Sequence, residues 1–102
     1  MRILGIDPGY GIIGFSVIDK SNSGNSVVDY GVITTPKDMP FDQRLKVIYE
    51  SMNTLIDKFS PQECAIEKLY FNKNITTGIP VAEARGVILL SIVTVSYTHL
   101  TL

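Results

Sequence analysis

Two acidic residues, Asp7 and Glu67, each close a short apolar segment of strand length. Ile3, Leu4 and Ile6 lead to Asp7, and Pro8-Gly9 follows it. Proline cannot donate to a strand ladder and glycine permits a tight turn, so the sequence predicts that a buried β-strand ends at Asp7. The alternative is that Asp7 only starts a turn. A partner acid decides between the two.

The second acid closes the segment Glu63–Glu67, a short strand that follows a long helix. Such an order predicts a strand parallel to the first. Neighbouring parallel strands lie about 4.8 Å apart, so the carboxylates of Asp7 and Glu67 would repel each other unless a cation lies between them. Carboxylate oxygens suit Mg²⁺ or Mn²⁺, which leave positions for phosphate oxygens and water. The alternative is a solvated Glu67 paired with Lys68.

The loop after Glu67 carries residue types that bind nucleic acid, namely Tyr70, Phe71, Lys73 and Asn74. Aromatic faces stack on unpaired bases, and lysine contacts phosphate. The composition therefore favours a DNA or RNA contact. The alternative is that an aromatic side chain covers the edge of the sheet.

The elements that position these residues begin with three strands, expected at residues 3–7, 13–19 and 27–35. Polar turn residues join the second strand to the third. A helix is expected over Phe41–Phe59, where apolar residues recur every three or four positions. The predicted fold class is α/β, with a three-strand antiparallel meander, one parallel strand and covering helices.

A second helix is expected from Thr76 to Leu90, with Pro80 in its first turn. Apolar residues lie on nearly all sides of this helix. The small residues Ala82, Ala84 and Gly86 allow a close approach of another backbone. We expect this helix to be buried on several sides, against the sheet and against a second subunit.

Gly9, Gly11 and Gly14 spell the G-x-G-x-x-G fingerprint of dinucleotide-binding proteins, and Asp29 lies at the usual distance. The fingerprint works only where the glycine turn opens a helix. Here the alternation after Gly11 predicts a strand. We therefore do not expect a dinucleotide site.

The chain has 102 residues, of which 45% are hydrophobic and 19% charged, and its formal net charge is −1. This length and composition are typical of one globular domain. With this net charge the protein has no overall basic field of the kind that indicates nucleic-acid binding. The single cysteine, Cys64, excludes a disulfide framework. The start has no signal-peptide pattern, and the apolar run 87–93 is too short to span a bilayer. We expect a soluble, cytoplasmic protein without membrane contact.

Taken together, the motifs resemble the RuvC family of bacterial Holliday-junction resolvases, which are ribonuclease H-like nucleases. The resemblance covers about residues 1–92 and is specific in combination. It runs through Ile3–Gly9, Arg44-Leu45, Ala65–Glu67, Phe71–Asn74 and Glu83–Val87.

The resemblance implies a ribonuclease H-like sheet in which Asp7 and Glu67 are the first two of four catalytic acids. These acids would bind two Mg²⁺ ions, or Mn²⁺, that activate water and stabilise the leaving 3′ oxygen. It also implies that the loop with Tyr70, Phe71 and Lys73 reaches the junction, and that the second helix, with Ala82, Arg85 and Gly86, forms a homodimer interface.

The same resemblance implies paired, symmetric cuts in a four-way DNA junction by a two-fold dimer, in recombination and repair. The resemblance also implies two protein partners, the junction-binding protein RuvA and the branch-migration motor RuvB. All of these are expectations from the family.

Residues 93–102 depart from the family pattern and read as a foreign tail, so His99 is not expected to be a ligand. The family's later strand, basic helix and last two acids are not recognisable, which makes the predicted domain C-terminally incomplete. We expect the polypeptide as written not to cut DNA. We also expect its parallel strand to lie at an unprotected sheet edge.

Three other function classes compete with the resolvase. An actin-like ATPase or sugar-kinase lobe would carry phosphate-loop serine or threonine where this chain has Ile12 and Ile13. A ribonuclease H-like RNA-processing nuclease shares Asp7, but the loop 71–74 fits it less well. A non-catalytic binding module would be favoured if Asp7→Asn left cleavage intact.

Overall fold

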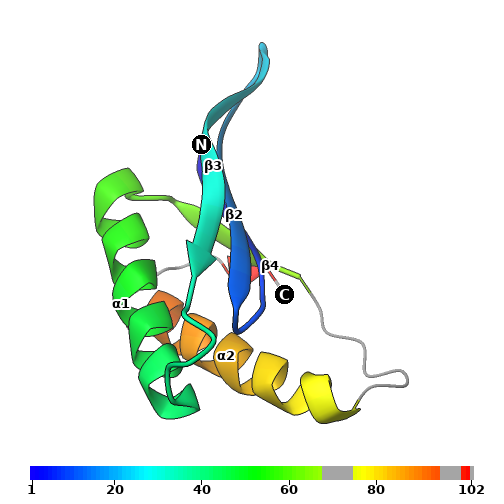
Figure 1. Ribbon diagram of the computed structural model, residues 1–102. Coiled ribbons are helices and arrows are strands. Elements are labelled where there is room, and N and C mark those ends of the chain that lie inside the picture. Colours follow the sequence, from blue (N-terminus) through cyan, green and yellow to red (C-terminus); the bar gives the residue numbers. More distant parts are fainter. Residues whose placement is uncertain (68–74, 95–99, 102) are drawn as a thin grey trace.

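The computed structural model describes residues 1–67, 75–94 and 100–101, and the side chains of all of these except 75–77 and 100–101. Figure 1 shows how the elements follow one another along the chain. They are β1 (Arg2–Asp7), β2 (Ile12–Ser21), β3 (Gly24–Thr34), α1 (Phe41–Phe59), β4 (Glu63–Ile66), α2 (Ile75–Val93) and β5 (Leu100–Thr101).

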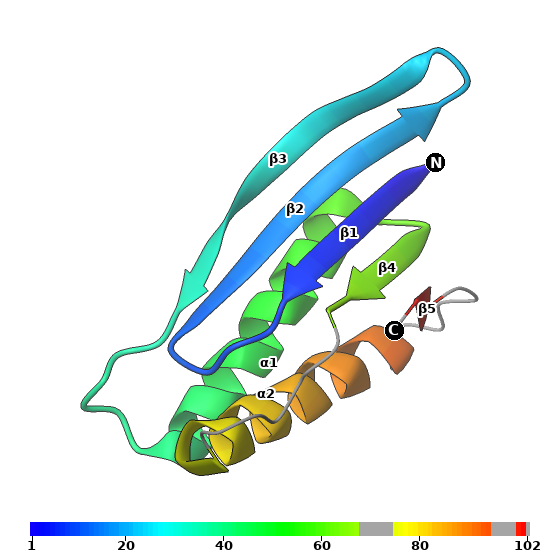
Figure 2. The ribbon, with the colours of Figure 1, turned by 90° about the vertical axis from the view of Figure 1, so that its right-hand side faces the viewer.

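The sheet has the strand order β3-β2-β1-β4-β5. β1 pairs antiparallel with β2 and parallel with β4, while β2 and β3 form a long antiparallel hairpin. Figure 2 shows these strands side by side, with both helices behind the sheet. The predicted antiparallel meander and its parallel partner strand are confirmed.

Helix α1 has the bounds that the sequence spacing predicts, Phe41–Phe59. Its buried residues recur every three or four positions, as expected for a helix that covers a sheet. The helix ends at Ser60, which has a left-handed backbone (φ 46°) and donates its N–H to the Ile56 carbonyl at 2.9 Å. The buried residues are Arg44, Ile48, Met52, Leu55, Ile56 and Phe59.

The core lies between the sheet and the two helices. Side chains alternate along the strands, so Leu4 and Ile6 of β1 face the same layer as Ile13 and Val17 of β2, and all four are buried. On α2 the buried positions are Ala84, Ile88, Ser91 and Ile92. The opposite face of the sheet has no helix over it in the described residues, and it exposes Ile12, Tyr30 and Val32.

Two sequence predictions about the second half of the fold are wrong. Helix α2 begins at Ile75, so Pro80 lies inside it, beyond the first turn. A proline there removes one helical hydrogen bond, which tertiary packing of the apolar helix must offset. In addition, β4 is not an unprotected edge, because β5 pairs parallel with Cys64 and Ala65. The backbone of residues assigned to a foreign tail supplies that partner.

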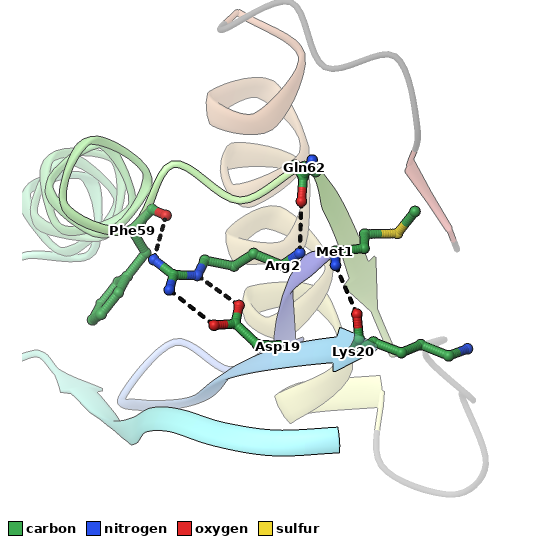
Figure 3. Close-up of polar contacts among 6 residues, drawn as sticks. All are labelled: Met1, Arg2, Asp19, Lys20, Phe59 and Gln62. Carbon is green, nitrogen blue, oxygen red and sulfur yellow. Dashed lines mark hydrogen bonds and ion pairs between the residues drawn. The ribbon is translucent and has the colours of Figure 1, made fainter. Parts of the chain in front are cut away.

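A guanidinium clamp fixes the start of β1. Arg2 donates from Nε and Nη2 to the two carboxylate oxygens of Asp19 on β2, at 2.9 and 3.1 Å. Its Nη1 donates to the Phe59 carbonyl at the end of α1, at 3.1 Å. The backbone N–H of Arg2 donates to Gln62 Oε1 at 2.8 Å. Figure 3 shows that these contacts join β1, β2 and the link from α1 to β4.

Candidate active site

Asp7 and Glu67 lie at the same end of two neighbouring parallel strands. Asp7 is the last residue of β1, and Glu67 follows the last residue of β4. The register pairs Ile6 with Ile66, and the Glu67 N–H donates to the Ile6 carbonyl at 3.1 Å. One residue further along each strand, the chain therefore brings both acids to the same place, as predicted. Both are exposed to solvent.

The pKa of Glu67 is raised above its usual value, most of all by hydrogen bonding with the neighbouring Asp7 side chain. The negative charge of Asp7 and partial desolvation act in the same direction, with smaller effects. Two carboxyl groups can share a hydrogen bond only when one of them holds a proton. The pair therefore favours a positive species between its oxygens, which a divalent cation supplies as well as a proton does.

Small residues leave open space beside the acids. An open hollow of about 510 Å³ is lined by Asp7, Glu67 and neighbouring sheet residues, among them Gly5, Gly14 and Gly31. Gly14 lies across from Asp7 on β2, and a side-chain carbon at Gly14 would stand 3.5 Å from the Asp7 Cβ. The sheet thus provides a shallow floor on which a substrate could lie next to the carboxylates.

Helix α2 contacts the site through Arg85. The Arg85 Nε donates to the backbone carbonyl of Glu67 at 3.3 Å, across 18 residues of sequence. This bond ties the position of Glu67 to α2. The sequence analysis placed Arg85 in a subunit interface and did not identify this contact, because a helix spacing pattern does not show which strand end the helix passes.

The residues present fit a divalent cation, but they fit it only in part. The two carboxylates at these strand ends are hard oxygen donors of the kind that Mg²⁺ and Mn²⁺ prefer. Across the described ranges 1–67, 75–94 and 100–101, no group of three or more histidine, cysteine or acidic residues could hold a metal. Further ligands would have to be water, phosphate oxygens or other protein groups.

The remaining predicted site residues divide into two groups. Tyr70, Phe71, Lys73 and Asn74 lie outside the described residues, as do Lys68 and His99. On α2, Ala82 and Arg85 are half-buried and Gly86 is exposed. The glycine fingerprint is not a dinucleotide site, because Gly14 lies within β2 and no helix follows the turn at Gly9–Gly11.

Comparison with known proteins assigns the chain to a family. The profile of the family described as crossover junction endodeoxyribonuclease RuvC matches residues 3–100. The chain belongs to the RuvC family. A relative in Thermotoga petrophila, named crossover junction endodeoxyribonuclease RuvC, is 56% identical over 92 residues, covering 90% of this chain and 56% of the relative. A relative of the same name in Finegoldia magna is 50% identical over 91 residues, covering 89% of this chain and 56% of the relative.

A solved structure described as Thermus thermophilus RuvC in complex with Holliday junction substrate has a TM-score of 0.89. At 20% identity it covers 100% of this chain and 65% of that chain, and it supports the ribonuclease H-like RuvC fold. The chain spans little more than half the length of the curated relatives that it matches. In the part of the chain that the structure describes, no helix is long and apolar enough to cross a membrane.

Proposed function

We propose that this chain carries part of the catalytic centre of a Holliday-junction resolvase, an endonuclease that hydrolyses phosphodiesters in four-way DNA junctions during recombination and repair. One observation carries the proposal: in a RuvC family member, Asp7 and Glu67 meet at the ends of paired parallel strands, where the Asp7 side chain raises the pKa of Glu67. The relatives' name, crossover junction endodeoxyribonuclease, and the junction substrate bound to the Thermus protein support the same reaction.

Asp7 and Glu67 would hold Mg²⁺, or Mn²⁺, with two ions per site in the complete enzyme. When bound, such ions activate water on one side of a phosphodiester and stabilise the leaving oxygen on the other. The chain's own residues position the two carboxylates and leave space beside them. The register of β1 with β4 brings the two carboxylates together, Arg85 holds the backbone of Glu67, and the glycine-lined floor leaves room for a nucleic-acid strand.

Helix α2 would form a homodimer interface that includes Ala82, Arg85 and Gly86. The exposed apolar side chains of Ile79, Leu90 and Val93 support this, since they recur at helical spacing on one side of α2 together with Gly86. A two-fold dimer would present two sites to a junction of matching symmetry. RuvA and RuvB as partners, and a cytoplasmic location, rest on the family alone.

The loop residues Tyr70, Phe71, Lys73 and Asn74 would contact the junction. Their chemistry supports this, since aromatic rings stack on bases and lysine contacts phosphate. We propose residues 1–92 as the nuclease part and 93–102 as a tail outside it. The boundary rests on the departure of residues 93–102 from the family pattern in the sequence, although the family profile extends to residue 100.

A chimaera tests the proposed reaction. Residues 1–92 replace the matching residues of the Thermotoga petrophila relative, and cleavage of a four-way junction is measured with Mg²⁺. We expect paired cuts that leave ligatable nicks, and a loss of at least about 100-fold in Asp7→Asn and Glu67→Gln chimaeras, because charge stabilisation at the reacting phosphate is lost. The 102-residue chain alone should not cut.

Asp57→Asn is the matched control, because it removes an exposed acid of α1 outside the site. It should leave the rate unchanged. Cleavage at the same rate by the Asp7→Asn chimaera would reject the proposed role of the acid pair and would favour a binding module instead.

A further inference from the structure

A second hollow, of about 470 Å³, lies where the turn after β1 meets the two helices. It is lined by the turn Gly9–Ile12, by Lys37 of the link from β3 to α1, by Arg44 of α1 and by Val81 of α2. The hollow that holds the acid pair has none of these residues in its lining. The acid pair and this hollow are thus separate spaces at the same end of β1.

Arg44 is a buried residue whose terminal nitrogen atoms have no hydrogen-bond partner among the described residues. The residue is 7% exposed, its Nε donates to the Pro36 carbonyl at 2.8 Å, and its guanidinium carbon lies 5.6 Å from the centre of the Tyr10 ring. Within the described part of the chain, no acid forms an ion pair with Arg44 and nothing accepts hydrogen bonds from its Nη1 and Nη2. The Pro36 carbonyl and the Tyr10 ring thus hold the guanidinium in place and leave two of its nitrogen atoms for an anion.

The donors of Arg44 open into the hollow. No buried side-chain nitrogen or oxygen among the described residues lacks a partner, so the terminal nitrogen atoms of Arg44 must be reached by solvent. The exposed Lys37 adds a second cation to the same wall, and it too has no ion pair in the described ranges. A planar fork of N–H groups beside a lysine is the arrangement that binds phosphate oxygens.

The position of the hollow identifies the phosphate. Gly9 is two residues after Asp7, so their Cα atoms are at most about 7 Å apart, at 3.3–3.6 Å per residue. We infer that this hollow binds a backbone phosphate of the nucleic-acid strand, next to the phosphate that lies at Asp7 and Glu67. The inference rests on the proposed nuclease function, and it makes Arg44 and Lys37 positioning residues that fix the register of the strand.

Two titrations without divalent metal test this inference, so that cleavage plays no part. The first follows the amide signals of Gly9 and Gly11 and the Arg44 Hε signal by NMR while inorganic phosphate is added. The second measures binding of four-way junction DNA to the 102-residue chain over a range of salt concentrations, with EDTA. The variants are Arg44→Gln, Arg44→Lys and Lys37→Gln, with Lys46→Gln as the control that removes the same charge from an exposed side of α1.

We expect phosphate to shift the three signals in the unchanged protein, and to leave the Gly9 and Gly11 amide signals of Arg44→Gln unshifted. Lys37→Gln should lower the slope of log K against log salt by about 0.7–0.9, the value for one lost phosphate contact. Arg44→Lys keeps the charge but loses the fork, so it should weaken binding and keep most of the slope. Lys46→Gln should change the slope less than Lys37→Gln does.

Equal slopes for Lys37→Gln and Lys46→Gln would overturn the inference even if Arg44→Gln fails to fold. Phosphate shifts without any effect of Lys37→Gln on DNA binding would show a site for free phosphate, and would overturn the strand contact. Absence of junction binding by the unchanged chain would overturn it as well. The acid-pair variants of the chimaera test the nuclease proposal separately, since they are measured by metal-dependent cleavage.

Discussion

Asp7 and Glu67 stand at the same end of two paired parallel strands, where the Asp7 side chain raises the pKa of Glu67, although a hairpin and a 19-residue helix separate the two strands in the sequence. The parallel register of β1 with β4 produces this contact, because Ile6 pairs with Ile66 and each acid follows at the next position. Two carboxyl groups this close favour a proton or a cation between their oxygens, because a like charge disfavours ionisation of the second group. The fold therefore creates a place for positive charge on an exposed edge of the sheet.

The turn after Asp7 should not tolerate a side chain at Gly9. A Cβ atom there would overlap the Ile12 carbonyl oxygen, which is part of the backbone and cannot move alone. We expect Gly9→Ala to lower the free energy of unfolding by roughly 1–3 kcal/mol, as overpacking does. Gly11→Ala is the control, since no atom lies within 4 Å of its added carbon. Urea denaturation should separate the two variants, and equal midpoints would contradict the turn geometry.

Packing of α2 on the core should depend on Ile88. This side chain is fully buried, so Ile88→Ala should lower the free energy of unfolding by about 2–5 kcal/mol, through lost burial and the cavity left behind. Leu90, two positions further along the same helix, is 53% exposed, and Leu90→Ala should cost far less. If chemical denaturation gave the same loss for both variants, α2 would not pack on the sheet in the way described.

The clamp between Arg2 and Asp19 should make part of the stability depend on acid pH. The hydrogen bonds and charge of Arg2 lower the pKa of Asp19 below its usual value. A lowered pKa in the folded state means that the stabilisation is present above the ordinary pKa of aspartate, about 3.9, and is lost as pH falls through the folded-state pKa. Thermal unfolding of Asp19→Asn should therefore occur at lower temperature than that of the unchanged protein at pH 6–7.

The difference between these two proteins should shrink as the pH falls below about 4. Asp29→Asn is a suitable control, since among the described residues its carboxylate accepts only a local backbone N–H, from Tyr30 at 2.8 Å. A gap in melting temperature that stayed constant down to pH 2 would show that the ion pair is not its cause.

Cys64 should be an unreactive thiol in the folded protein. Burial in the core, together with the nearby charge of Glu63, raises its pKa to about 11. The unfolded chain ionises near 9.0, so ionisation of this thiol should lower the stability between about pH 9 and 11. At pH 8 we expect alkylation by iodoacetamide to be at least about 100-fold slower than in urea-unfolded protein. Comparable rates in the two states would place Cys64 outside the core.

Much of this architecture could be predicted from the sequence, because the signals are local. The spacing of apolar residues gives α1 its bounds from Phe41 to Phe59, and the apolar run before Asp7 gives β1. The meeting of Asp7 and Glu67 also follows, because a strand after a crossover helix is parallel to the first strand and ends at the same edge. Local pattern and one topological rule were enough for the acid pair.

The contacts that sequence reasoning missed are those that depend on three-dimensional packing. The Arg85 bond to the Glu67 carbonyl, the Arg2 clamp and the pairing of β5 with β4 join segments without any shared local pattern. Local preference predicts Pro80 in the first turn of α2, because proline is favoured there, but the helix begins earlier, at Ile75. In this case tertiary packing outweighs the local preference of one residue.

Metal binding by the acid pair is the central claim, and paramagnetic broadening tests it most directly. Mn²⁺ is added to the labelled 102-residue chain, and the amide signals of residues 5–9 and 65–67 are followed by NMR. We predict selective broadening of these signals in the unchanged protein and in Asp57→Asn, and its loss in Asp7→Asn and Glu67→Gln. Equal broadening in the unchanged protein and both acid-pair variants would contradict the assignment of Asp7 and Glu67 as the metal ligands.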